Sequence, residues 1–274
     1  MKKIMVQFFI ILMFLSFSAI PVSSQDQTPQ PSERKALEMA IAELDELMVN
    51  KTIENCEKAI KGYKLLLEKK PNHYKILYKL ANAHTAILDI KTSALIVEKN
   101  EFKPMLREMG KTANEYAKRA YQLKPGDKDV IASTLVSYAY YSASFGIVKA
   151  IFKGAAGRYK KLARELIAVD DKHLGALGYR MMGKLYHVAP WPVGSSRKAL
   201  KFFKKAVEAD NTVLYSHYYL GELLFDKDKY DLAEKEFKFV VENEPASHEK
   251  HLMEAYKKEA GNYLTKIAKK KRDD

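Results

Sequence analysis

The chain has 274 residues, of which 47% are hydrophobic and 11% aromatic, so it can bury a substantial core in one or two domains, and a disordered protein is excluded. It has only 12 Gly and 9 Pro, which favours long helices over a strand-rich fold with many turns. The formal net charge is +13, yet the basic residues are spread among Glu and Asp, as on a solvated surface.

Residues 1–24 have the order of a secretory signal peptide. Lys2 and Lys3 precede an apolar run from Ile4 to Ile20, and small residues follow it. We therefore expect export with cleavage after Ser24. A retained N-terminal membrane anchor is the alternative, because the run is just long enough to span a bilayer. Cys56 is the only cysteine, so no internal disulfide can form, and an exported chain without disulfides fits a bacterial periplasm.

This location limits the partners. An exported protein meets little nucleic acid, so we expect no nucleic-acid partner. The basic tail at 269–272 and the scattered positive charge leave peripheral contact with an anionic membrane open.

Helical patterns cover most of the remaining chain. A flexible, polar leader at 25–32 precedes a helix that we expect from Glu33 to about Asn50. A domain of helical repeats is then expected over 33–247. A capping helix from about His248 to Lys269, with the basic tail, completes the chain over 248–274.

The repeat is clearest towards the C-terminus, where two sets of residues lie 34 apart, namely Ala199, Phe203 and Ala206 against Ala233, Phe237 and Val240. Small residues at such spacings let two antiparallel helices approach, and the large ones fill the seam between them. The same pattern occurs upstream at intervals of 54, 46 and 40 residues. It indicates about four helical pairs with insertions between and within them.

Residues 175–245 resemble tetratricopeptide repeats closely, and residues 56–171 resemble them more weakly. The stretch 177–260, with GKLYHVAPW before one helix and YKKEA after Pro245, also resembles the helical domain of the regulator-of-microtubule-dynamics family. Export with long insertions is similar to the tetratricopeptide subunit of tripartite periplasmic transporters, although this chain lacks the lipoprotein cysteine common in that group. The resemblances imply an all-α solenoid of antiparallel helix pairs that binds something, and none implies chemistry.

No motif argues for catalysis. The GKT at 110–112 ends like a phosphate-binding loop, but Met105 stands where that motif needs glycine. The HEKH at 248–251 is similar to a zinc-binding helix, but its two His are three apart instead of four, and we expect a solvated start to the last helix. We therefore expect no enzyme activity, no cofactor and no metal site.

The concave face is the expected binding surface. In a tetratricopeptide array it is lined by the face of each first helix that is not used for packing. That register gives the candidate residues Tyr78, Asn82, Arg180, Lys184, His187, Tyr218, Glu222 and Phe225. Arg180 and Lys184 would hold a carboxylate, and Tyr218 or Phe225 would offer flat contact to an apolar body. A merely solvated inner face is the alternative.

Two hypotheses for the function follow. The first is an exported, non-catalytic scaffold or adaptor that binds a protein or peptide partner of the cell envelope through its concave face. The second is a solute-binding accessory subunit of a periplasmic transporter, with a small organic acid as ligand and a pocket closed by the long insertions.

Residues 142–158, SASFGIVKAIFKGAAGR, form an unusual insertion. Apolar residues at 147, 148, 151 and 152 lie at helical spacing, with lysines on the other flank. A plain packed insertion, an interfacial membrane helix and a segment that folds over the groove are the three interpretations.

Residues 186–196, YHVAPWPVGSS, hold the only tryptophan. Pro190 and Pro192 stop the preceding helix, and the repeat spacing places a four-residue insertion here. We expect a lengthened turn whose Trp191 indole packs over the neighbouring insertion, so that Trp191→Ala mainly costs stability. Contact of this loop residue with a ligand is the alternative.

Overall fold

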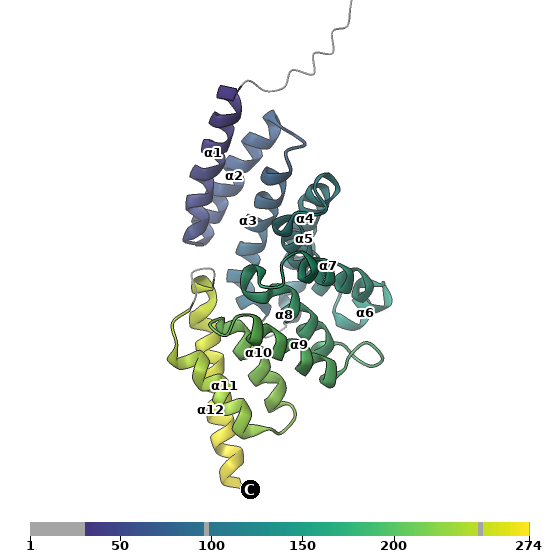
Figure 1. Cartoon of the computed structure of the whole chain (residues 1–274), viewed down its shortest axis with the longest axis vertical. Coiled ribbons are helices and arrows are strands. Elements are labelled where there is room, and N and C mark those ends of the chain that lie inside the picture. The colour runs from purple at the N-terminus through teal and green to yellow at the C-terminus, as the bar shows by residue number, and fades with distance from the viewer. Residues whose placement is uncertain (1–30, 96–98, 246–248, 274) are drawn as a thin grey trace, which may run out of the picture.

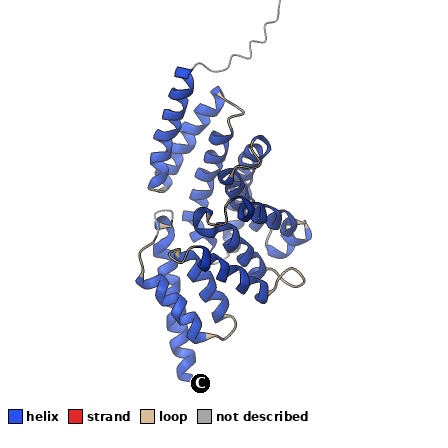
Figure 2. Ribbon diagram, viewed as in Figure 1, coloured by secondary structure: helices blue, strands red, loops and turns tan. Residues whose placement is uncertain are grey.

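The computed structural model describes residues 31–95, 99–245 and 249–273, and these form twelve α-helices and no β-strand (Figure 1; Figure 2). The helices are α1 (Pro31–Val49), α2 (Ile53–Lys69), α3 (Tyr74–Thr92), α4 (Lys103–Leu123), α5 (Lys128–Ala143), α6 (Ile147–Phe152), α7 (Ala155–Val169), α8 (His173–Val188), α9 (Ser196–Ala209), α10 (Leu214–Phe225), α11 (Tyr230–Glu242) and α12 (Met253–Asp273). Short 3₁₀ turns lie at η1 (Ser93–Leu95), η2 (Asn100–Phe102) and η3 (Lys250–Leu252).

The helices pack in sequence order along the long axis of the molecule (Figure 1). The pairs are α3 with α4, α5 with α7, α8 with α9, and α10 with α11. α1 and α2 extend the stack at its N-terminal end, and α12 packs on α11 at the other end. The expected all-α solenoid of helix pairs is therefore confirmed.

The residues of the 34-residue pattern form the seams of the last two pairs. Phe203 and Phe237 are both fully buried. Burial of a Phe side chain contributes about 1.5–3 kcal/mol. Gly183 on α8 lies so close to the Phe203 ring that a Cβ atom there would be 2.4 Å from it. Gly221 on α10 has the same relation to Phe237, at 3.0 Å. The absence of a side chain on one helix thus lets the aromatic ring of its partner fill the seam.

Side chains at the chain turns fix where three of the helices begin. Thr52 before α2, Asp127 before α5 and Ser195 before α9 accept hydrogen bonds from N–H groups of the first turn, at 3.1, 3.2 and 3.4 Å. Such caps satisfy donors that have no partner within the helix. The insertions therefore connect helices with defined ends.

The two terminal helices differ in length from the expectation. α1 begins at Pro31, inside the expected leader, while the expected signal peptide lies outside the described residues. α12 begins at Met253 and continues beyond Lys269 into the basic tail. There Lys271 forms ion pairs with Asp231 at 2.5 Å and Glu234 at 2.6 Å on α11. Part of the basic tail is therefore held by acidic partners.

The segment before α12 is not the solvated start that we expected. Glu249 is fully buried, and its carboxylate accepts hydrogen bonds from the N–H groups of Leu214 at 3.2 Å and Tyr215 at 2.9 Å. It caps the N-terminus of α10, where the helix dipole favours negative charge. The His251 side chain is 9% exposed, so the expectation of a solvated segment was wrong. His248 lies outside the described residues.

Trp191 corrects a second expectation. A lengthened turn does connect α8 to α9, and backbone hydrogen bonds close it, including Ser195 N–H to the Tyr186 carbonyl at 2.8 Å. The indole itself is 89% exposed, so the expectation that it packs over the neighbouring insertion was wrong. Because the turn is held by its backbone, Trp191→Ala has no structural reason to cost much stability.

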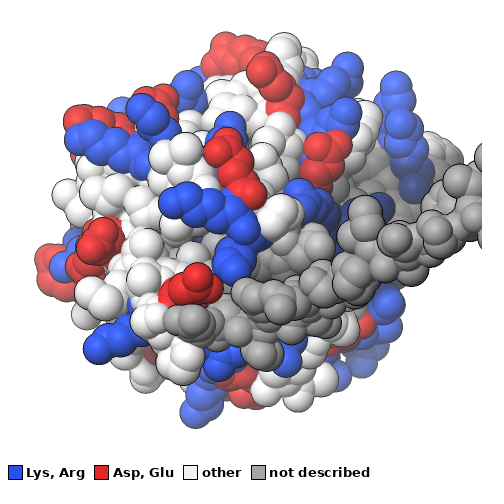
Figure 3. Space-filling model, turned by 90° about the horizontal axis from the view of Figure 1, so that it is seen from above, with Lys and Arg blue, Asp and Glu red and all other residues white. Residues whose placement is uncertain are grey.

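Charge of both signs is mixed over the surface. Figure 3, a view from above, shows Lys and Arg side chains interspersed with Asp and Glu over the face that is visible. Such a mixture is typical of a solvated surface rather than of a nucleic-acid-binding face. Among the helices of the described ranges, none combines the length and the apolar character that crossing a bilayer requires.

We expect Gly183→Ala to lower the free energy of unfolding by about 1–3 kcal/mol, because the added methyl group overlaps the Phe203 ring. Gly261→Ala on α12 is the matched control, since nothing lies within 4 Å of a Cβ atom there. The control should raise stability by about 0.5–1 kcal/mol through helix propensity. Urea unfolding followed by circular dichroism measures both, and equal effects would contradict the close approach.

Candidate functional site

A cavity of about 520 Å³ lies between helices of successive pairs, and Lys51, Asp89 of α3 and Ala94 of η1 are also at its wall. Side chains of α5, α6, α7, α8, α10 and the η3–α12 segment line it. Helices from three successive pairs therefore border the same cavity. Two segments outside the helical repeat, α6 and the η3–α12 segment, also border it.

Most of this wall is apolar. α5 contributes Val136, Ala139 and Ala143, and α8 contributes Leu177 and Met181. Residues three or four positions apart lie on one face of a helix, so each of these helices turns an apolar stripe towards the cavity.

α6 supplies another apolar wall from within the 142–158 insertion. Its residues Ile147, Ala150 and Ile151 line the cavity. Gly146 and Gly154 flank the helix with φ of 76° and 78°, the left-handed region that glycine adopts without a steric penalty. These two glycines allow the chain to leave α5, run along the cavity and turn into α7.

Arg180 on α8 is the buried cation of the cavity. The residue is only 6% exposed. One guanidinium N–H donates to the Leu174 carbonyl at 2.7 Å, and the group lies over the Tyr215 ring at 5.0 Å. The Nε–H has no hydrogen-bond partner among the described residues. A buried donor without a partner costs about 1–3 kcal/mol, so an acceptor at this atom would stabilise the wall.

Two short stretches of strained backbone border the same cavity. Leu174 has φ of 48° and Ala94 has φ of 53°, and both line it. Residues with a Cβ atom adopt this left-handed conformation at a cost of about 1–2 kcal/mol each. Such strain persists where the surrounding structure imposes it, and it gathers at functional sites.

A second cation, Lys184, is already paired. Its Nζ lies 2.9 Å from Glu222 Oε2, and that carboxylate is also 3.6 Å from His187 Nδ1. His187 Nε2 lies 2.8 Å from Asp226. Burial opposes the charge of Lys184, but the Glu222 carboxylate outweighs it and raises the pKa of the lysine. Lys184 therefore carries a charge that Glu222 neutralises.

Hydroxyl and imidazole groups complete the polar side. Tyr140 donates a hydrogen bond to Asp89, and His251 Nε2 lies 3.7 Å from the same carboxylate. Burial, with the charge of Asp89, raises the pKa of the Tyr140 hydroxyl well above its usual range, so this hydroxyl stays neutral. The hydroxyls of Tyr219 and Tyr256 lie 2.6 Å apart.

The cavity brings together three of the residues expected on the concave face, namely Arg180, Lys184 and Glu222. His187 does not line it but contacts Glu222. Tyr218 is only 1% exposed, because its ring packs edge-on against Tyr256, with centroids 4.8 Å apart. It belongs to the core rather than to the cavity wall.

The other expected residues lie elsewhere. Phe225 packs on Tyr263 with ring centroids 5.0 Å apart. Tyr78 is 9% exposed within a separate hydrophobic cluster of the first helices, and Asn82 is exposed on α3. Trp191 is on the exposed turn after α8. None of these four lines the cavity.

Sequence reasoning missed several residues of the wall. Asp89, Tyr159 and His251 come from the end of α3, from α7 and from η3, outside the register used for the first helices. Tyr219 lies next to the expected position 218, and its ring receives Lys184 Nζ at 4.7 Å. The apolar pattern of 142–158 was the available signal for α6.

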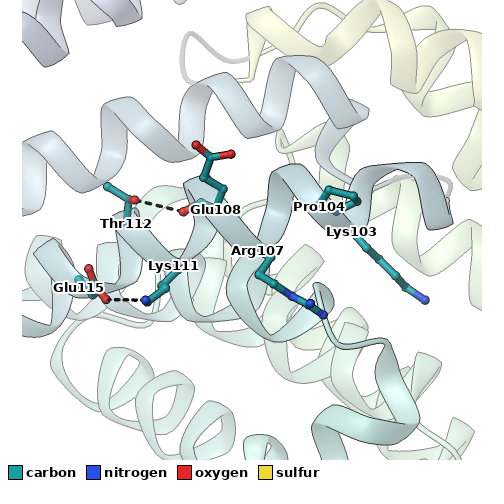
Figure 4. Close-up of a pocket in the computed structure, with 7 residues that line it drawn as sticks. All are labelled: Lys103, Pro104, Arg107, Glu108, Lys111, Thr112 and Glu115. Atoms are coloured by element: carbon teal, nitrogen blue, oxygen red, sulfur yellow. Dashed lines mark hydrogen bonds and ion pairs between the residues drawn. The ribbon is translucent and has the colours of Figure 1, made fainter.

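A second hollow, of about 630 Å³, is a shallow groove along α4 alone (Figure 4). Lys103, Arg107 and Lys111 project from it with Glu108 and Glu115. Lys111 Nζ lies 3.8 Å from Glu115, in an exposed pair along the same helix. The groove is a charged, open surface and not an enclosed site.

Metal chemistry has no support in the part of the chain that is described. No group of three or more His, Cys, Asp or Glu side chains there is arranged so that it could hold a metal ion. Cys56 is buried, and burial raises the pKa of its thiol to about 11, which suppresses the nucleophilic thiolate form.

We expect Glu222→Gln to lower the free energy of unfolding by about 1–3 kcal/mol, because it leaves Lys184 partly buried without its carboxylate. Glu54→Gln is the matched control, since Glu54 pairs with Lys58 on an exposed face, and it should leave stability unchanged. Denaturant unfolding at pH 7 measures both. A loss of the same size in the two variants would contradict the structural role of the buried pair.

The sequence matches no protein-family model and no curated protein. Solved structures are similar in fold. The thermophilic tetratricopeptide protein TTC0263 of Thermus thermophilus is 15% identical, covers 84% of this chain and 99% of its own, and superposes with a TM-score of 0.59. The MamA protein is 17% identical, with coverage of 76% and 92% and a TM-score of 0.46. With the helix pairs and their glycine–phenylalanine seams, the first of these similarities shows that the chain has the fold of a tetratricopeptide-repeat α-solenoid.

Proposed function

We propose that the chain is a non-catalytic binding protein of the cell envelope that holds a small ligand on its concave face. The observation that carries this proposal is the cavity of about 520 Å³, mostly apolar and with a few polar groups on one side. Small-molecule sites typically occupy about 300–1,000 Å³ and have this composition.

The boundaries of the cavity favour a small ligand over an extended peptide. Ile147 and Ile151 of α6 border it, and so do His251 and Leu252 of the η3 segment. An extended peptide would have to pass such boundaries, whereas a compact solute would not. The solute-binding accessory subunit is thus the more specific form of the proposal.

A protein adaptor is the second candidate. The surface of α4 favours it, because Lys103 and Arg107 project into an open groove suited to an acidic segment (Figure 4). An adaptor of this kind would bind its partner on α4 and not in the cavity. The two candidate functions therefore differ in the surface that the partner or ligand covers.

We propose no catalytic role and no cofactor. The acidic groups of the cavity have partners, since Glu222 faces Lys184 and Asp89 accepts a hydrogen bond from Tyr140. Such pairs suit recognition and positioning, whereas a general base needs a free position within reach of a substrate proton.

We propose export to the periplasm, which rests on the pattern of residues 1–24. The mature chain should then begin at Gln25. Mass spectrometry of the protein from a periplasmic extract tests this, with the cytoplasmic and membrane fractions as controls. Recovery of the full-length chain in the membrane fraction would instead support the retained anchor.

A thermal-shift experiment tests the small-ligand function. A ligand present at 100 times its dissociation constant stabilises by about 2.7 kcal/mol, which for a chain of this size raises the melting temperature by about 5–10 °C. We expect such a shift from members of an organic-acid panel and none from acidic or basic peptides.

Ala139→Phe, which fills the cavity from α5, should remove the shift. A shift that peptides cause and that survives this substitution would support the adaptor instead.

A further inference from the structure

The cavity holds one buried cation that forms no ion pair among the described residues. Lys184 faces Glu222 at 2.9 Å, and His251 faces Asp89 at 3.7 Å. Arg180 forms no ion pair with a carboxylate of the described residues; it contacts the Leu174 carbonyl and the Tyr215 ring. Lys51 also lines the cavity without an ion pair among the described residues, but it is only half-buried, so Arg180 is the buried cation that lacks a carboxylate.

We propose that the cavity binds one aliphatic monocarboxylate, with its carboxylate on Arg180 and its hydrocarbon chain along α5, α6 and α8. This inference rests on the proposed small-ligand function and names the class of ligand.

The anionic group follows from the state of Arg180. Its guanidinium is 6% exposed, and its Nε–H is buried without a partner. Guanidinium donors match the two oxygens of a carboxylate, and hydrogen bonds between charged groups are about twice as strong as neutral ones. Stacking on Tyr215 at 5.0 Å and the hydrogen bond to the Leu174 carbonyl fix the orientation of the group before a ligand arrives.

A single negative charge follows from the surroundings. Glu222 and Asp89 also line the cavity. Glu222 pairs with Lys184, and Asp89 accepts a hydrogen bond from Tyr140, so a second anionic group close to these side chains would meet carboxylates. Dicarboxylates with two adjacent charges are therefore disfavoured.

The hydrocarbon chain follows from the other walls. Val136, Leu177 and Met181 line the cavity from α5 and α8, and Ile147 and Ile151 line it from α6. Each buried methylene group contributes about 0.8 kcal/mol, or about fourfold in affinity, and the unbranched Met side chain adapts to a flexible chain. A short, polar acid would leave this surface without a partner.

Isothermal titration of the purified chain at pH 8 tests the proposal with four probes below their critical micelle concentrations: dodecanoate, dodecanol, dodecyltrimethylammonium and lysophosphatidylglycerol. We expect dodecanoate to bind one molecule per chain and more tightly than the other three. Decanoate should bind about fifteenfold more weakly than dodecanoate, because it lacks two methylene groups.

Arg180→Met retains the unbranched side chain but removes the charge. It should weaken dodecanoate about 10–100-fold and leave dodecanol unchanged, because only the carboxylate uses the guanidinium. Arg197→Met, an exposed arginine on α9, is the matched control and should change neither. Ala139→Phe should abolish both. Circular dichroism and the melting temperature of each variant establish that it is folded.

If Arg180→Met does not fold, Arg180→Lys replaces it, and a loss of affinity for dodecanoate with dodecanol unchanged is again expected. Equal affinity for dodecanoate and dodecanol would overturn the carboxylate assignment while leaving the small-ligand function intact, and so would tighter binding of lysophosphatidylglycerol. If none of the four probes binds and no organic acid shifts the melting temperature, both the ligand class and the small-ligand function are wrong.

Discussion

The close approach of the two helices in each pair is the constraint on which the rest of the structure depends. Phe203 fills the seam only because Gly183 has no side chain, and Phe237 stands against Gly221 in the same way. Arg180 and Lys184 are four residues apart on α8, so they lie on one face of the helix, and both line the cavity. The packing of α8 against α9 fixes the rotation of α8 and thereby the direction of that face.

The insertions, and not the repeat, turn this inner face into a cavity. α6 brings apolar side chains over it, held between Gly146 and Gly154. At the other side, the Glu249 carboxylate caps α10 and thereby holds His251 and Leu252 at the wall. A buried carboxylate at a helix N-terminus is stabilised by the unpaired N–H groups and the helix dipole. The Glu249 cap therefore fixes the start of α10 and also positions part of the cavity wall.

The sequence predicts the features that depend on helical periodicity. It does not predict which neighbouring element an individual side chain packs against. The 34-residue spacing locates the seams, and the register places Arg180, Lys184 and Glu222 on the inner face. The same register places Tyr218 there, but α12 covers that face of α10, and Tyr218 packs on Tyr256 instead. No local pattern reports which helix will cover another. The prediction that Trp191 packs against a neighbouring segment was wrong for a related reason. The sequence places an indole in a turn, but it does not show whether another segment lies close enough to cover it.

Arg180 and the left-handed backbone near it are costs that the rest of the solenoid must offset. A buried donor without a partner costs about 1–3 kcal/mol, and a left-handed residue with a Cβ atom costs about 1–2 kcal/mol. Both costs fall on one wall, because the guanidinium donates to the carbonyl of Leu174, which is itself left-handed. Elsewhere, the seams around Phe203 and Phe237 bury their aromatic rings completely. Stability gained in the seams thus supports a wall that is destabilised without a ligand, and an acceptor on Arg180 would recover part of that cost.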